Sequence, residues 1–160
     1  MKFIFGIIPG YDVYALDKAM ALVRPGLEEI AALTPAESNA FQIYLSLRSG
    51  ARTLVMSFVD TDTPPDKQQF GVMQKLILSP QDYSGFYITE LAEHALHLYQ
   101  VYVKPEYRTG ELITLGFMDV LAKAKNVKAP YLTTCTKEKE IMQRMGFAES
   151  YTKYQLKLGV

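Results

Sequence analysis

VYVKPEYRTGELI, residues 101–113, joins a strand pattern directly to a helix pattern. Alternating β-branched and aromatic residues up to Val103 predict a strand, and helical periodicity begins after Gly110. A helix that starts in a turn presents unpaired N–H groups and a partial positive charge, which together hold anions such as phosphate. Arg108 adds a cation to the same turn. The stretch therefore predicts an anion-binding turn, although a solvated turn arginine is the plainer interpretation of Arg108.

Length and composition predict one domain over residues 1–160. The chain is 49% hydrophobic and 21% charged, as ordinary globular proteins are. Its 17 Lys and Arg residues balance 17 Asp and Glu residues, so no electrostatic footprint for nucleic acid or an anionic membrane is expected. No apolar run reaches the roughly 20 residues that cross a bilayer, and the apolar segment at 3–8 is too short for a signal-peptide core.

A single cysteine, Cys135, excludes an internal disulfide. It fits a reducing compartment, or a particle assembled in one. We therefore expect a cytoplasmic protein, or one built into a particle in the cytoplasm, that is not secreted. The chain has 11 tyrosines and 7 methionines, residue types that are enriched at protein interfaces. Protein partners or a homo-oligomer are expected, rather than nucleic acid or membrane.

Apolar spacing predicts helices in the first third of the chain. Asp12 is the expected N-cap of the first helix, which Pro25 ends. Thr-Pro-Ala-Glu at residues 34–37 is a capping box with proline at the first helical position, and it opens a helix that stops at residues 49–50. A short helix at 27–33 is expected between the two.

The remaining segments predict mainly strands. A polar connection at 60–69 is interpreted as a hairpin loop. The expected strands are short and rich in β-forming residues, and they comprise residues 3–8, 52–59, 70–78, 86–91, 95–103, 131–135 and 151–158. Helices are expected at 112–125 and at 137–145, the second ended by Gly146.

This order of elements predicts an α/β (α+β) fold. A strand, helix and strand unit follows an antiparallel meander, which gives a mixed, mostly antiparallel sheet of about six to seven strands flanked by about four helices. The crossover helix makes us expect that the strands at 99–103 and 131–135 run parallel and separate around the Arg108 turn.

Residues 96–147 resemble the acetyl-CoA segment of the GNAT superfamily of N-acetyltransferases. In that family an Arg or Gln is followed by Gly three residues later and by Gly or Ala five residues later. Arg108 matches the first position, whereas Glu111 and Ile113 occupy the two glycine positions, and Gly110 lies one residue early. Side chains at these positions keep a pyrophosphate from the backbone N–H groups, and a glutamate also repels it.

The resemblance implies a GNAT-like acyltransferase fold that binds acetyl-CoA and moves its acetyl group to an amine. It implies that Arg108, Thr109 and Gly110 hold the pyrophosphate. It also implies that the backbone N–H groups of Val101 and Val103 polarise the thioester. A cradle rebuilt in a shifted register around residues 109–110 remains an alternative.

A second family segment also departs from the pattern. GNAT enzymes commonly place an Asn and, seven residues later, a Tyr on the helix before a Gly-Phe pair. Counted back from Gly146 and Phe147, these places hold Cys135 and Met142. The Tyr hydroxyl usually protonates the departing thiolate, which methionine cannot do. Both departures indicate weak or lost activity.

A looser resemblance links the chain to GNAT-like proteins encoded by bacteriophages, some of which are virion or assembly components. It implies an alternative function as a non-catalytic structural or protein-binding component. Among residues that could serve catalysis, Glu93 and His97 are candidate general bases, set against ordinary structural roles. His94 and His97 would point to opposite faces of a strand, so no metal site is expected.

Overall fold

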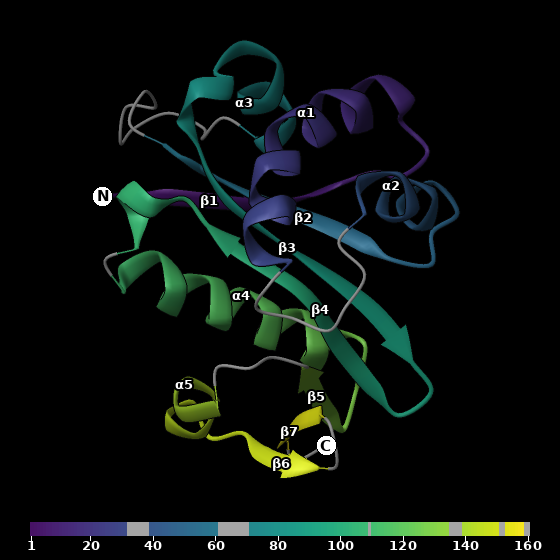
Figure 1. Ribbon diagram of the computed structural model, residues 1–160, viewed down its shortest axis with the longest axis vertical. Helices are drawn as coiled ribbons and strands as arrows, with labels where there is room; N and C mark the ends of the chain where they lie inside the picture. Colours follow the sequence, from purple (N-terminus) through teal and green to yellow (C-terminus); the bar gives the residue numbers. More distant parts are fainter. Residues whose placement is uncertain (32–38, 61–70, 109, 135–138, 151–152, 159–160) are drawn as a thin grey trace.

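The computed structural model describes residues 1–31, 39–60, 71–108, 110–134, 139–150 and 153–158. These residues form strands, α-helices and two 3₁₀ helices, whose arrangement Figure 1 shows. In chain order the elements are β1 (Phe3–Ile8), α1 (Val13–Ile30), α2 (Ala40–Arg48), β2 (Thr53–Val59), α3 (Val72–Leu78), η1 (Pro80–Asp82), β3 (Tyr83–Ala92), β4 (Ala95–Val103), η2 (Pro105–Tyr107), α4 (Glu111–Asn126), β5 (Tyr131–Thr134), α5 (Lys139–Arg144), β6 (Ala148–Ser150) and β7 (Lys153–Lys157).

All seven strands of the described residues join one sheet in the order β1-β2-β3-β4-β5-β7-β6. Neighbouring strands from β1 to β4 run antiparallel, as do β5 with β7 and β7 with β6. By contrast, β4 and β5 run parallel, because α4 carries the chain back between them. The predicted mixed, mostly antiparallel sheet and its parallel pair are therefore confirmed.

Helices cover both faces of the sheet. Leu54 and Met56 of β2 pack in the core beneath α1, α2 and α3, whereas Val55 between them packs in the core beneath α4. Figure 1 shows α1 to α3 on one side of the strands and α4 on the other. Because β2 is buried on both faces, its sequence reads as a nearly continuous apolar run rather than as an alternation.

Pro25 does not end the first helix, contrary to the sequence prediction. Helix α1 continues through Pro25 to Ile30. Residues 27–30, which were expected to begin a separate helix at 27–33, form the final turn of α1 instead. A proline inside a helix costs about 3 kcal/mol. Burial of Leu27 and Ile30 returns roughly 1.5 to 3 kcal/mol for each side chain, so packing outweighs the local preference.

Helix α2 begins later than expected. Its N-cap is Asn39, whose side-chain oxygen accepts hydrogen bonds from the N–H groups of Phe41 and Gln42 at 3.0 and 3.2 Å. The capping box at 34–37 lies outside the described residues. The predicted stop is confirmed, since α2 ends at Arg48, before Ser49 and Gly50.

Residues 70–78 were expected to form a strand, and this is wrong because α3 occupies Val72–Leu78. Buried Val72 and Leu76 recur at helical spacing, and Gly6 of β1 lacks the Cβ that would lie 2.8 Å from the Val72 side chain. Close packing on β1 therefore decides the conformation. The connection after Asp60 leads to a helix and is not a hairpin loop, and residues 61–69 lie outside the described part of the chain.

The end of the chain differs in a second way. The strand expected at 151–158 is confirmed as β7 within Lys153–Lys157, but β6, which pairs with it antiparallel, was not expected, and residues 151–152 lie outside the description. The short predicted helix before Gly146 is confirmed as α5. Gly146 has a φ of +89°, which favours glycine. With α3 included, the described residues contain five α-helices rather than about four.

Strand β4 contains a β-bulge at Tyr99. Ile88 of β3 pairs with Gln100, and the next residue, Thr89, pairs with Leu98, so Tyr99 is an extra residue in β4. Pairing between β4 and β5 ends at the same point, with Leu98 opposite Thr134. A bulge bends its strand. Within the described residues, the pairing of the two parallel strands therefore stops at Tyr99.

Tyr102 packs directly on the backbone of α1 at Gly26. A Cβ on Gly26 would lie 2.6 Å from Cδ1 of the Tyr102 ring, which is far inside contact distance. The close approach brings the Tyr102 hydroxyl to Glu29, one turn later in α1, at 2.8 Å. Gly26 therefore determines where the end of α1 meets β4.

We expect Gly26→Ala to destabilise the protein by about 1 to 3 kcal/mol, because the new methyl group displaces the Tyr102 ring. Gly116→Ala in α4 is the matched control, since a Cβ there would lie 3.7 Å from Phe5, an ordinary contact. It should stabilise the helix by up to about 1 kcal/mol. Urea denaturation measures both changes, and equal effects would contradict the packing argument.

Candidate functional site

A cleft of about 380 Å³ opens where β4 and β5 separate. Its walls come from the end of β4, from Thr134 of β5, from the inner side of α4 and from Met142 of α5. The lining is mainly apolar, and Arg108 is the one charged residue among the described lining residues. The cleft lies beside the turn that the sequence singled out.

The cleft exposes a strand edge with backbone groups available for hydrogen bonding. The N–H of Lys104 donates to Ser84 of β3 at 2.9 Å. Because backbone groups alternate in direction along an antiparallel strand, those of Val101 and Val103 point away from β3, into the gap. No strand of the described residues pairs with them there. Their direction suits the polarising role that the family resemblance implies.

The turn after β4 supplies the N-terminus of α4. Gly110 is the N-cap residue and has a φ of +91°, a conformation that favours glycine. Thr109 lies outside the described residues. Glu111 occupies the first turn of the helix with its side chain 51% exposed, and Ile113 lines the cleft. A carboxylate and a branched side chain therefore stand where an incoming phosphate would approach.

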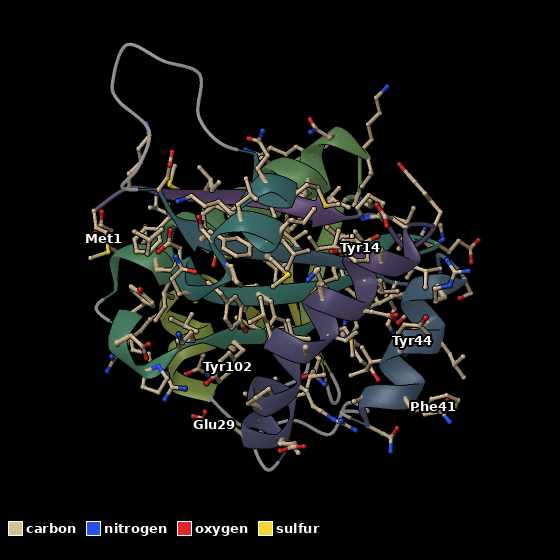
Figure 2. All side chains as sticks on the ribbon, turned by 90° about the horizontal axis from the view of Figure 1, so that it is seen from above. Met1, Tyr14, Glu29, Phe41, Tyr44 and Tyr102 are labelled. Carbon is tan, nitrogen blue, oxygen red and sulfur yellow. The ribbon has the colours of Figure 1, made fainter. Side chains whose placement is uncertain are left out.

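Arg108 is held by two protein groups. Its Nε donates to the carbonyl oxygen of Val103 at 2.8 Å, and its guanidinium pairs with a Glu29 carboxylate oxygen at 2.6 Å. The other carboxylate oxygen of Glu29 accepts the Tyr102 hydroxyl. Figure 2 shows Glu29 at the end of α1, next to Tyr102. A salt bridge therefore links α1 to the turn across 79 residues of sequence.

These contacts shift the pKa values of all three side chains. The hydrogen bond from Arg108, followed by that from Tyr102, holds the pKa of Glu29 below its usual value of 4.5. The same ion pair raises the pKa of Arg108. Burial, and then the hydrogen bond to Glu29, raises the pKa of the Tyr102 hydroxyl. At neutral pH the cluster therefore holds one cation, one anion and one neutral phenol.

The methionine in place of the expected tyrosine lies in the cleft itself. Met142 lines the wall, and a thioether there cannot donate a proton. Tyr87 also lines the cleft, but its hydroxyl is 2.5 Å from Asp119, and burial followed by this hydrogen bond raises its pKa. Its proton is therefore engaged with the protein.

The two candidate general bases lie outside the cleft lining. Glu93 is in the turn between β3 and β4, with its side chain 88% exposed and an oxygen 3.7 Å from His94. His97 pairs with β5, where its Nδ1 lies 2.9 Å from the Thr133 hydroxyl. In the described part of the chain, no three His, Cys, Asp or Glu side chains group together as metal ligands would.

Sequence reasoning missed Glu29, Tyr87 and Tyr102. Glu29 is one of two acidic residues on the helix predicted at 27–33, and no local spacing connects it with Arg108. No local spacing connects Tyr87 or Tyr102 with the turn either. Only the fold brings these groups to one place.

The residues present fit a coenzyme in part. The β4 edge and the cleft suit an extended pantetheine arm, which would run past Val101 and Val103. The turn suits the pyrophosphate less well, because Glu111 adds negative charge and Glu29 already neutralises Arg108. Coenzyme chemistry is therefore better supported along the strand than at the helix N-terminus.

Several solved structures have a similar fold. A protein of Desulfovibrio desulfuricans assigned to the GNAT family matches with a TM-score of 0.67 and 16% identity, over 99% of this chain and 100% of that one. PaiA N-acetyltransferase of Thermoplasma acidophilum, in complex with coenzyme A, matches at 0.60 and 11%, over 97% of each chain. YhbS of Escherichia coli, a GNAT N-acetyltransferase in complex with CoA, matches at 0.64 and 10%, over 99% of this chain and 83% of that one.

This protein therefore has the fold of the GNAT N-acetyltransferases. No protein-family model and no curated protein sequence matches the chain. None of the helices in the described residues combines the length and apolar character that crossing a bilayer requires.

We expect Glu29→Gln to lower stability at neutral pH, because it removes the anion that pairs with Arg108. A carboxylate with a lowered pKa in the folded state stabilises the protein above its usual pKa of 4.5, and this contribution is lost as the pH falls through the lowered value. The difference in unfolding free energy from the unmodified protein should therefore shrink below about pH 4.5. Urea denaturation between about pH 3 and 7 measures it.

The control for this series is Glu28→Gln, which removes an exposed carboxylate from the same helical turn. It should leave the stability difference small across the pH range. A difference for Glu29→Gln that stays constant from neutral to acidic pH would show that the ion pair with Arg108 does not stabilise the fold.

Proposed function

We propose that the protein binds acetyl-CoA weakly in the cleft and retains at most slow transfer of the acetyl group to an amine. The observation that carries this proposal is the open cleft along the free edge of β4, next to the N-terminus of α4. The fold shared with GNAT N-acetyltransferases supports it. Fold alone does not determine activity, which depends on the residues of the cleft.

In this chemistry the amine nitrogen attacks the thioester carbonyl carbon, a C–N bond forms and the C–S bond breaks. Coenzyme A supplies the activated acyl group when bound. The N–H groups of Val101 and Val103 face the gap, where they would stabilise the negative charge that develops on the carbonyl oxygen. The described lining offers no carboxylate or imidazole to remove the amine proton, and Met142 does not protonate a thiolate. These features support a slow reaction.

The turn lowers the expected affinity. Glu111 and Ile113 stand where the family pattern has glycines, and side chains there replace two close approaches of phosphate to the backbone. Each charge-assisted hydrogen bond is worth about 1.5 to 3 kcal/mol, so the loss is roughly 3 to 6 kcal/mol. This corresponds to a factor of about 10² to 10⁴ in affinity, which moves a micromolar ligand towards the millimolar range.

Calorimetry with acetyl-CoA should therefore detect weak binding or none in the unmodified protein. Arg108→Ala should abolish whatever binding remains. Glu111→Gly should strengthen binding because it removes both bulk and charge, and Glu111→Gln, which removes charge alone, should give part of the gain. Glu106→Gln, in the preceding 3₁₀ helix, is the charge-matched control and should give little gain. Micromolar binding by the unmodified protein would contradict the weak-binding proposal.

Exposed apolar side chains favour a second candidate function, a non-catalytic role in protein contacts. Tyr14 of α1 and Phe41 and Leu45 of α2 are 62%, 65% and 44% exposed. Figure 2 shows Tyr14, Phe41 and Tyr44 along α1 and α2 at one side of the molecule. Aromatic side chains are enriched in the cores of protein interfaces.

If α1 and α2 mediate self-association, sedimentation velocity should show an oligomer that Phe41→Asp converts to the monomer. Met118→Asp is the control, since Met118 is 59% exposed on α4, away from both helices. A monomer at every concentration would remove the homo-oligomer from this second candidate.

A further inference from the structure

The cleft continues beneath α4, away from the gap between β4 and β5. Phe5 of β1 and Val55 and Ser57 of β2 belong to its lining, together with Leu112 and Gly116 of α4. Strand β3 separates β2 from β4, so the cavity extends over several strands, in the space between one face of the sheet and α4. An extended arm that follows the β4 edge leaves this limb of the cavity free.

Several polar side chains around the cavity direct their hydrogen bonds to the protein. The Ser57 hydroxyl lies 2.8 Å from that of Ser84 and donates to the Gly85 carbonyl at 3.1 Å. The Tyr87 hydroxyl donates to Asp119, and the Thr134 hydroxyl donates to the carbonyl oxygen of Leu98 at 3.0 Å. A polar ligand beneath α4 would lose its hydrogen bonds to water without replacing them. The chemistry of this limb therefore favours a hydrocarbon.

The size of the cavity also suits a chain longer than acetyl. An apolar cavity of about 150 Å³ in another protein stays dry and binds benzene. The volume here is about 380 Å³ over the whole cleft, of which the limb beneath α4 is a part. Two carbons of an acetyl group would leave much of that limb empty.

The strand register connects the two parts of the cleft. Val101 on the free edge pairs with Tyr87, and Tyr87 pairs with Val55, so these residues form one row across the sheet. Their side chains belong to the lining beneath α4. An acyl group carried to the β4 edge near Val101 can therefore extend along this row, over the face of the sheet that α4 covers.

We propose that the cleft takes a straight-chain acyl group of medium length, such as octanoyl, with the chain in the limb beneath α4. This proposal rests on the proposed binding of coenzyme A thioesters and changes the substrate class from acetyl to longer acyl groups. The hydrocarbon would supply affinity that the turn at Glu111 does not.

Calorimetry with CoA and its acetyl, butyryl, hexanoyl and octanoyl thioesters tests the proposal. Each methylene that enters the apolar limb should raise the affinity by up to about fourfold. Butyryl-CoA should then bind up to about fifteenfold more tightly than acetyl-CoA. Measurable acetyl-CoA binding with an affinity that stays flat or falls towards octanoyl would overturn the proposal and leave the proposed function intact.

Gly116→Leu places a side chain toward Phe5 and should fill the limb. It should lower the ratio of octanoyl-CoA to acetyl-CoA affinity towards one. Met118→Leu, on the exposed side of the same helix, is the control and should preserve the ratio of the unmodified protein. An unchanged ratio in a folded Gly116→Leu variant would place the chain elsewhere and overturn the proposal.

S-octanoylpantetheine, which lacks the nucleotide and pyrophosphate, separates the two proposals. If it binds and no CoA compound does, the hydrocarbon site stands and the proposed coenzyme function fails. If neither octanoylpantetheine nor any CoA thioester binds, both proposals fail.

Discussion

The β-bulge at Tyr99 is the constraint on which the form of the site depends. Two parallel strands joined by a helix would ordinarily pair along their shared length. Here the extra residue shifts the register of β4 against β3 at the point where pairing with β5 ends. Beyond it β4 keeps β3 on one side, and on the other side no strand of the described residues pairs with it. The cleft opens at this point, and the backbone groups of Val101 and Val103, which pairing with β3 directs away from that strand, face it.

The pair of Glu29 and Arg108 connects stability with binding. The carboxylate occupies the guanidinium that a phosphate would otherwise use, and it also ties the end of α1 to the turn after β4. A phosphate at Arg108 would have to displace this carboxylate or share the cation with it. The same contact therefore holds the wall of the cleft in place and opposes the charge that the turn would attract. Gly26 makes the arrangement possible, because it lets Tyr102 approach α1 closely enough to orient Glu29.

The sequence contained enough local information for most strands and for the helix after the Arg108 turn. Residues 95–103 have strong β-formers and a sharp boundary at Pro105, and the strand was predicted with its observed limits. Prediction failed where tertiary packing overrides local preference. Pro25 is accommodated because the apolar residues after it are buried. Val72 belongs to a helix because Gly6, which has no side chain, leaves room for Val72 to pack closely on β1.

The site was predictable only where a linear motif marks it. Arg108, Gly110 and the strand before them stand out in the sequence, whereas Tyr87 and Tyr102 line the cleft, and Glu29 pairs with Arg108, through contacts distant in sequence. The positions of Glu93 and His97 show the opposite limitation. Their residue types suit base catalysis, but the strand and hairpin that carry them place both outside the cleft lining.

The free edge of β4 has a consequence for how the protein avoids aggregation. Exposed strand edges rich in β-branched and aromatic residues are templates for pairing with other chains, and proteins commonly protect them with charges, prolines or bulges. Residues 101–103 are Val-Tyr-Val, a sequence that would be hazardous at an outer edge. This edge instead borders the cleft, where α4 lies over one face of the sheet, while Val101 keeps 49% of its surface exposed. The Arg108 side chain caps the Val103 carbonyl, so a charged residue occupies part of the hydrogen-bonding edge that another chain would need for pairing.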